Sequence, residues 1–314
     1  MTVRCWTKIF VFVFLFLPLL LSGCINSGFT IWSSVQPNTV KQTPDLLVIE
    51  NVKVIPEKVY PDTEFTVYFT VRHTGDPSTS TAVGYFLTAY DFGVCKKVKA
   101  SWNMDTASSF LKTENYPEKI QPGEIKDYSL TLKAPSPQEI ANLEAKCPVR
   151  LKITYSYTAK TQIEAYVMSE ERMKILQRTG KYSAYIPTEQ VGIGPVKLYF
   201  EFTQSQPFVA GKNVVFFLYA KNEGDGNVES EASTPEIHVK VKVLGGSGGI
   251  IRCSGTSSGE ITLHFVGEQT NKVKCTWIPE LQNGDEKIFY LLATATYVYS
   301  FEKTVDVTVF PLPE

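Results

Sequence analysis

The stretch VRLKITYSYT, residues 149–158, carries the most regular pattern in this sequence of 314 residues. Positions 149, 151, 153 and 155 are apolar or aromatic, and the positions between them are polar. Successive side chains of a β-strand point to opposite faces of its sheet. The alternation therefore predicts a strand with one face in a core and the other face in water.

Similar strand signals occur along most of the chain. Residues 65–71, FTVYFTV, are rich in the β-branched and aromatic residues that pack well on a pleated surface. Asn283-Gly284 is the strongest hairpin signal, because both residues accept positive φ. The pattern predicts an all-β chain. The other predicted strands are residues 46–49, 52–55, 83–90, 128–132, 196–202, 214–220, 237–244, 261–265, 273–277 and 289–299.

Three segments are candidates for helix. Ser136-Pro137-Gln138-Glu139 has a capping serine, a proline at the first helical position and a glutamate three residues after the cap. This arrangement predicts a helix that ends near Lys146. Residues 104–113 are a weaker candidate, and residues 169–178 fit either a helix or a last strand. We therefore expect short helical insertions in the first half of the chain.

The two halves of the sequence follow one scheme. VYPD at 59–62, followed by a strand and Gly75-Asp76, matches VAGK at 209–212, followed by a strand and Gly224-Asp225. TYSY at 154–157 matches TYVY at 296–299. We interpret the halves as two divergent copies of one β-sandwich. The predicted division is a first sandwich over residues 45–180, a linker over 181–194 and a second sandwich over 195–314.

The first 24 residues predict export and anchoring. Arg4 and Lys8 precede an uncharged apolar run, residues 9–21, which is shorter than the roughly 20 residues of a membrane-spanning helix. Leu21-Ser22-Gly23-Cys24 resembles the lipobox of a lipoprotein signal peptide. This resemblance implies a signal peptide over 1–23, lipid attachment at Cys24 and a polar tether over 24–44. An ordinary signal peptide or an uncleaved anchor is the alternative.

The opening of each half resembles the immunoglobulin-like modules of prokaryotic surface proteins, particularly the cell-adhesion-related type. In those modules a turn with Pro or Gly leads into an aromatic-rich strand that ends in an Asn-x-Gly loop. Asn222-Glu223-Gly224 matches that loop, whereas the first half has His73-Thr74-Gly75. The resemblance covers only part of each half. It implies two tandem immunoglobulin-like β-sandwiches in a surface lipoprotein of a prokaryote, archaea included, and a binding or spacer role.

Four cysteines follow the anchor position, two in each half of the chain. In an oxidising compartment their distribution predicts the disulfides Cys95–Cys147 and Cys253–Cys275, because only this pairing keeps each bridge within one half. A zinc site is the alternative. None of the four cysteines belongs to a C-x-x-C pair, and the three histidines are scattered. We therefore expect disulfides and no metal.

No motif in the sequence supports catalysis. GTSSG at 255–259 fits the nucleophile elbow of hydrolases, but that elbow requires a helix where we expect a strand. GGSGG at 245–249 lacks the Lys and Ser/Thr of a phosphate-binding loop, and DFG at 91–93 stands without other kinase elements. The acidic turn at 223–227 is a candidate for calcium, although such turns are usually only solvated. We expect no catalytic residue and no cofactor.

The net charge of −1 argues against nucleic-acid binding. We expect a non-enzymatic protein, lipid-anchored at the extracytoplasmic face of the cell membrane, that binds a protein or a surface polymer. One alternative is a solute-binding lipoprotein of a transporter, a class that is usually α/β. Another is a subunit of a surface filament or envelope assembly whose residues 25–50 add to a neighbour's sheet edge.

Overall fold

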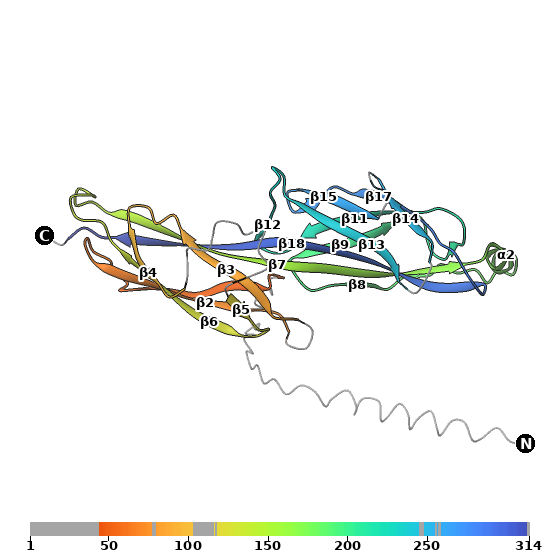
Figure 1. Cartoon of the computed structure of the whole chain (residues 1–314), viewed down its shortest axis with the longest axis horizontal. Helices are drawn as coiled ribbons and strands as arrows, with labels where there is room; N and C mark the ends of the chain where they lie inside the picture. The colour runs from red at the N-terminus through yellow and green to blue at the C-terminus, as the bar shows by residue number, and fades with distance from the viewer. Residues whose placement is uncertain are drawn as a thin grey trace, which may run out of the picture. The chain divides into compact units, whose positions relative to one another are not determined.

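The computed structural model describes residues 44–76, 80–102, 116, 118–244, 248–254, 256 and 259–312. All of them belong to one compact unit, Thr43–Glu314. Antiparallel strands dominate this unit, so the predicted all-β class is confirmed (Figure 1). Within these ranges no helix is long and apolar enough to span a membrane. The predicted signal peptide, Cys24 and all of the tether except Pro44 lie outside them.

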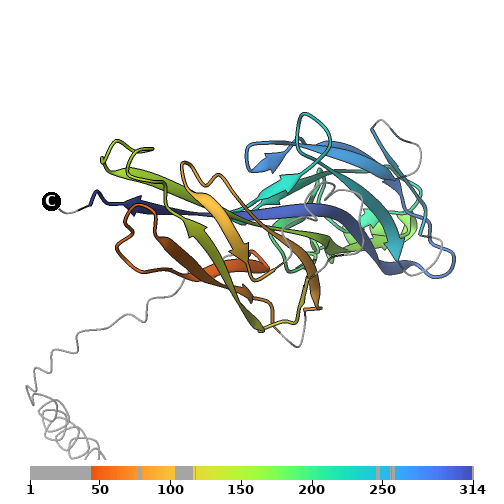
Figure 2. The ribbon, with the colours of Figure 1, turned by 60° about the vertical axis from the view of Figure 1, so that its left-hand side comes forward.

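The strands form two groups along the two longest strands, β7 (Ala145–Met168) and β18 (Glu286–Val309). In the first group one sheet has the order β1-β2-β6-β4, and the other contains β5, β3 and parts of β7 and β18 (Figure 2). The bounds of its shorter strands are β1 Leu47–Ile55, β2 Glu64–His73, β3 Val83–Tyr90, β4 Lys96–Ala100, β5 Glu118–Ile120 and β6 Ile125–Lys133.

In the second group β13 and β15 extend the sheet of β7 and β18, and β9, β11, β17 and β14 form the other sheet. The short strand β16 pairs with both β11 and β15 and so connects the two sheets. The bounds are β8 Glu189–Val191, β9 Val196–Phe202, β10 Phe208–Val209, β11 Val214–Asn222, β12 Asn227–Glu229, β13 Glu236–Leu244, β14 Ile250–Cys253, β15 Glu260–Val266, β16 Gln269–Thr270 and β17 Val273–Ile278.

β7 and β18 pair along their full lengths. The register runs without a shift from Ala145 opposite Val309 to Met168 opposite Glu286. The alternation at 149–158 is the middle of this ladder, and Val149, Leu151 and Ile153 are all fully buried there. The division into residues 45–180 and 195–314 stays a prediction. The end of β18 belongs to the second of these ranges, yet it pairs with the beginning of β7 in the first group of strands.

Each group of strands packs around one tryptophan. The Trp102 ring meets the Phe69 ring edge-on, with centroids 5.5 Å apart, and the Trp277 ring meets the Phe289 ring in the same way at 5.7 Å. Both indole N–H groups donate to backbone carbonyls, at 2.8 and 2.7 Å. Burial of a large apolar side chain contributes about 1.5–3 kcal/mol, and the paired N–H removes the penalty for burying a donor.

The described part of the chain contains two disulfides, Cys95–Cys147 and Cys253–Cys275, which are the pairs that the sequence predicts. The first fixes the segment before β4 to β7, and the second joins β14 to β17. The Cα atoms are 5.7 and 4.0 Å apart, and the bridges span 52 and 22 residues. Loops of these lengths correspond to about 4 and about 3 kcal/mol of stabilisation through the unfolded chain.

The predicted helix from Ser136 to about Lys146 is wrong. The capping contacts do form, because the Glu139 carboxylate accepts from the Ser136 N–H at 2.7 Å and the Ser136 hydroxyl accepts from the Glu139 N–H at 3.3 Å. The chain then continues as turns, with Ala141 and Asn142 at positive φ. The ambiguous segment at 169–178 is the helix α2 (Glu170–Arg178), capped by Ser169. Residues 104–113 lie outside the described ranges.

Candidate functional site

The acidic turn at 223–227 is occupied by groups of the protein itself. The Asn222 amide accepts from the Gly224 N–H at 3.2 Å and donates to the Gly226 carbonyl at 2.7 Å. The Asp225 N–H donates to the carboxylate of Asp45 at 2.9 Å. Among the residues that the structure describes, no group of three acidic, His or Cys side chains is arranged for a metal ion.

The other motifs do not form sites either. A β-strand, β15, follows the stretch at 255–259, so the helix of a nucleophile elbow is missing there. Gly255, Ser257 and Ser258 themselves lie outside the described residues. His73 is buried, with the Gly75 N–H donating to its Nδ1 at 3.0 Å, and burial lowers its pKa. His238 and His264 flank Glu236 on an exposed surface.

One edge of β7 has an opening between its partners. β18 covers the opposite edge completely, whereas on this edge β3 pairs with residues 150–155 and β8 pairs with 161–163. No strand in the described part of the chain pairs here with residues 156–160. We call this gap the opening. It is about 16 Å long at roughly 3.3 Å per residue.

Hydrogen bonds beside the opening show which backbone groups face it. The Gly192 N–H donates to the Lys160 carbonyl at 2.8 Å, and the Glu164 N–H donates to the Thr188 carbonyl at 3.1 Å. Backbone groups on one edge of a strand recur at every second residue. The N–H and C=O of Thr158 therefore point into the opening, where no strand of the described chain pairs with them.

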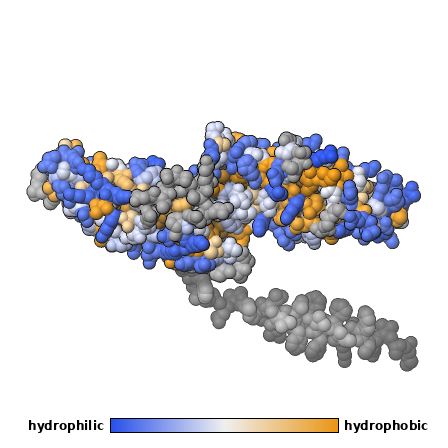
Figure 3. Space-filling model, in the orientation of Figure 1, coloured by the Kyte–Doolittle hydropathy of each residue, from blue (hydrophilic) through white to orange (hydrophobic). Residues whose placement is uncertain are grey.

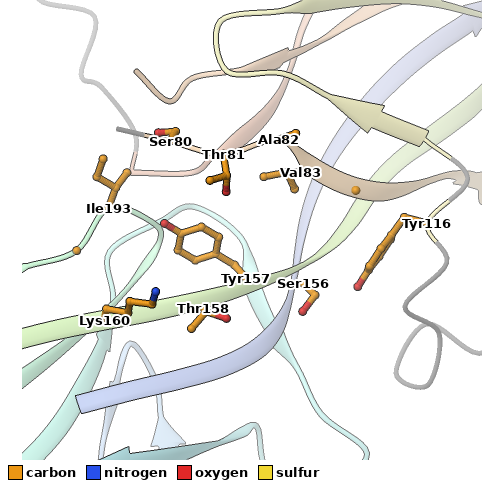
Figure 4. A pocket seen from close by; sticks show the side chains of 12 residues that line it. Ser80, Thr81, Ala82, Val83, Tyr116, Ser156, Tyr157, Thr158, Lys160 and Ile193 are labelled. Atoms are coloured by element: carbon orange, nitrogen blue, oxygen red, sulfur yellow. The ribbon is translucent and has the colours of Figure 1, made fainter. Parts of the chain in front are cut away.

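A hollow of about 410 Å³ lies at this opening (Figure 4). Figure 4 shows Tyr157, Lys160 and Ile193 on one side and Tyr116 on the other. The hollow is lined by residues from the beginning of β3, the middle of β7 and the segment after β8: Ser80, Thr81, Ala82, Val83, Gly84, Tyr116, Ser156, Tyr157, Thr158, Lys160, Gly192 and Ile193.

Two glycines allow the walls of the hollow to come this close. A Cβ atom at Gly84 would lie 2.8 Å from the Cβ of Tyr116, and one at Gly192 would lie 2.6 Å from the carbonyl oxygen of Lys160. A side chain at either position would push a wall away. These glycines stand beside strand signals in the sequence, but nothing in their own pattern predicts a binding site.

The polar groups of the hollow are hydroxyls and one cation. Burial raises the pKa of Tyr116 and of Tyr157, so both phenols are neutral. The Thr158 hydroxyl lies 2.9 Å from that of Thr296 in the neighbouring strand. No residue of the described chain forms an ion pair with the exposed Lys160, and none of the lining residues is acidic. The hollow therefore has the properties of a site for a polar, uncharged or anionic ligand.

A second surface feature is apolar. On the face shown in Figure 3, apolar residues gather over the second group of strands, near β11 and β14. Ile250 is 55% exposed there, and Val215 and Phe217 are half-buried on the outer side of β11. This surface is not enclosed and has few groups that could orient a ligand, so the hollow is the stronger candidate.

No family model matches this sequence, and no curated protein matches it. Comparison with solved structures returns surface proteins of bacteria. The adhesin InvE of Yersinia pseudotuberculosis is 11% identical, with a TM-score of 0.20 over 82% of this chain and 58% of that one. The chain thus spans less than two thirds of that adhesin.

Two further structures align at still lower TM-scores. The collagen adhesin CNA from S. aureus is 12% identical, with a TM-score of 0.11 over 84% of this chain and 93% of that one. The collagen-binding domain of the surface protein RspB from Erysipelothrix rhusiopathiae is 11% identical, with a TM-score of 0.10 over 85% and 91%. Similarity at this level carries no argument about the function of this chain.

Proposed function

We propose that this chain is a non-enzymatic binding protein, held at the extracytoplasmic face of a prokaryotic cell membrane by lipid on Cys24. Its partner is a surface polymer or a protein, which it recognises through the hollow beside Thr158. The lipobox and the polar tether support the anchoring. Both disulfides support an oxidising compartment outside the cytoplasm.

The edge of β7 that no described strand covers, at the hollow, is the observation that carries the binding role. Backbone N–H and C=O groups require hydrogen-bond partners, and no strand in the described part of the chain supplies them to Thr158 on this edge. A ligand that enters the hollow supplies such partners. It is also surrounded by side chains from three separate segments, which is the usual construction of a binding site.

A solute-binding lipoprotein of a transporter has less support. Such proteins place helices between the strands of two lobes and bind their solute at a hinge. The described part of this chain has strands throughout and a single helix of nine residues, α2, which does not line the hollow. Its two groups of strands also share the continuous ladder of β7 and β18, which leaves no hinge segment between them.

A bulky residue in the hollow tests the proposed binding role. Ala82 is exposed and lines the hollow, so Ala82→Trp fills the space without disturbing the core. We expect the full chain, purified in detergent, to bind particles of its own organism's cell envelope, and the variant to bind them about tenfold more weakly or worse. Cosedimentation of the labelled protein measures both affinities.

The matched control is Ala232→Trp, which places the same ring on an exposed loop that does not line the hollow. This variant should bind the particles like the wild type, and both variants should unfold at the wild-type temperature. If Ala82→Trp binds as well as the wild type, the hollow is not the binding site and the proposed function is wrong.

A further inference from the structure

The hollow is closed at both ends along β7, which limits the kind of ligand that it accepts. At one end Gly84 and Tyr116 cover the strand, and at the other the Gly192 N–H is bonded to Lys160 and Ile193 lies above it. An extended peptide that paired with β7 would have to continue past these walls. A compact ligand of one or two rings fits inside, since small-molecule sites typically enclose about 300–1,000 Å³.

The lining combines aromatic faces with hydroxyls. The rings of Tyr157 and Tyr116 lie on opposite sides of the hollow, and Ser156, Thr158 and Thr81 contribute hydroxyl groups. The Thr158 backbone adds one donor and one acceptor next to each other. A pyranose ring has the matching chemistry: its C–H face packs on an aromatic ring, and its neighbouring hydroxyls pair with adjacent donors and acceptors.

The charge of the lining residues favours a pyranose ring that bears a negative group. Lys160 and Tyr157 both line the hollow, and the described residues that line it include no carboxylate that could neutralise the ammonium group of Lys160. A single cation is suited to one carboxylate of a ligand, whereas tight recognition of a phosphate group typically uses several donors or an arginine fork. A purely apolar ligand would leave the Thr158 backbone groups unpaired.

We infer that the hollow binds an acidic saccharide, one or two pyranose rings of which one bears a carboxylate. The ring packs on Tyr157, its hydroxyls bond to Thr158, and its carboxylate lies at Lys160. This inference rests on the proposed function and names the ligand class of the same site.

Uronic-acid disaccharides and their neutral hexose counterparts are the probes that test it. The two sets differ only in a carboxylate in place of a hydroxymethyl group, so their difference in affinity reports the charge of the site. Calorimetry with the full chain in detergent should show binding of the acidic disaccharides about tenfold tighter than that of the neutral ones. Raising the salt concentration should reduce this preference.

Lys160→Gln should remove the preference and retain weak binding of both sets. Lys242→Gln is the matched control, because Lys242 is an exposed lysine on the same sheet, in β13, and does not line the hollow. Equal affinity for acidic and neutral disaccharides, no binding of either set, or an unchanged preference in Lys160→Gln overturns the inference.

The variant Ala82→Trp distinguishes a wrong saccharide assignment from a wrong proposed function. If the acidic disaccharides do not bind but Ala82→Trp still weakens binding to envelope particles, the hollow has another ligand, such as a peptide, and only the saccharide assignment is wrong. If Ala82→Trp changes neither measurement, both the saccharide assignment and the proposed function are wrong.

Discussion

Asp45 carries a carboxyl group that is fully buried at the beginning of the described chain. One of its oxygens accepts from the Asp225 N–H, whereas Oδ1 has no hydrogen-bond partner in the structure. Burial is the main cause that raises the pKa of Asp45 above 3.8, and the negative charge of Asp225 adds to it. Tyr155 and Tyr299 lie close enough for the Asp45 charge to raise their pKa values in turn.

Asp45→Asn should change how stability depends on pH. The folded chain holds the Asp45 proton to a higher pH than the unfolded chain does, so this residue favours folding below pH 3.8 and loses that effect as the pH rises through the raised pKa. Asparagine has no such dependence. We expect the variant to gain about 1–3 kcal/mol relative to the wild type between pH 3.5 and pH 7, the usual cost of an unpaired buried group.

Denaturant unfolding of both proteins at a series of pH values measures this gain. Asp306→Asn, the same change at an exposed position of β18, is the control and should run parallel to the wild type. If the free energies of unfolding of Asp45→Asn and the wild type differ by the same amount at every pH, the raised pKa of Asp45 is contradicted.

At the scale of an element, β7 shows how one side chain can take the place of a strand. Gln206 is 2% exposed. Its amide accepts from the Tyr166 N–H at 2.7 Å and donates to the Glu164 carbonyl at 2.9 Å. These are the even-numbered residues whose backbone groups face the edge of the opening. Gln206 therefore continues the ladder between β8 and β10, whereas no strand of the described chain continues it at residues 156–160.

Gln206→Leu tests whether the edge of β7 depends on the Gln206 amide. The Tyr166 N–H and the Glu164 carbonyl lose their partners, which should lower the free energy of unfolding by about 1–3 kcal/mol. Hydrogen exchange provides the local measurement. The Tyr166 amide should exchange faster, whereas the Ala165 amide, which faces β18, should keep its protection. Equal protection of Tyr166 in both proteins would show that its N–H does not depend on Gln206.

The segment at 136–146 shows why local signals predict some elements and not others. Its capping contacts form as the sequence predicts, yet the helix does not follow. The chain must enter β7 at Ala145, where Cys147 is bonded to Cys95 and the ladder with β18 begins. A helix of two or three turns is marginal by itself, so the long-range pairing and the disulfide prevail over it.

At the scale of the whole molecule, periodicity predicted the strands and the cysteine order predicted the disulfides, because both depend on local or pairwise rules. The similarity of TYSY at 154–157 and TYVY at 296–299 predicted a repeat. In the structure these stretches are cross-strand partners, with Tyr155 opposite Tyr299 and Tyr157 opposite Tyr297. Because aromatic side chains stabilise a sheet when they lie opposite one another, similar stretches can mark two strands that pair.

The hollow could not be predicted from the sequence. It exists because the pairing of β7 with β3 ends at Tyr155 and its pairing with β8 begins only at Thr161. Each of those limits is set by contacts between segments more than twenty residues apart, and single-sequence patterns do not contain such contacts. In the sequence the lining residues, such as Thr158 and Lys160, have the pattern of an ordinary solvent-exposed face of a strand.

The anchor is a property of the whole chain, and Cys24→Ser tests it. If Cys24 carries lipid, the full chain should fractionate with membranes and the variant should move to the soluble or secreted fraction. The tether adds no polybasic patch that could help to hold the chain at the membrane, because Lys41 is the only basic residue between Cys24 and Leu46. A single short acyl chain binds reversibly, so stable retention requires several chains on this one residue, at about 0.8 kcal/mol per buried CH₂.

Cys5→Ser is the matched control, since it removes the other N-terminal thiol and should leave the protein in the membrane fraction. Mass spectrometry of the N-terminal peptide distinguishes the remaining cases. A lipid-modified Cys24 at the N-terminus supports the anchor directly. If Cys24→Ser stays in the membrane with residues 1–23 attached, the apolar segment at 9–21 holds the chain there. The lipid on Cys24 is then ruled out as the cause of retention, while the proposed role of the hollow is unaffected.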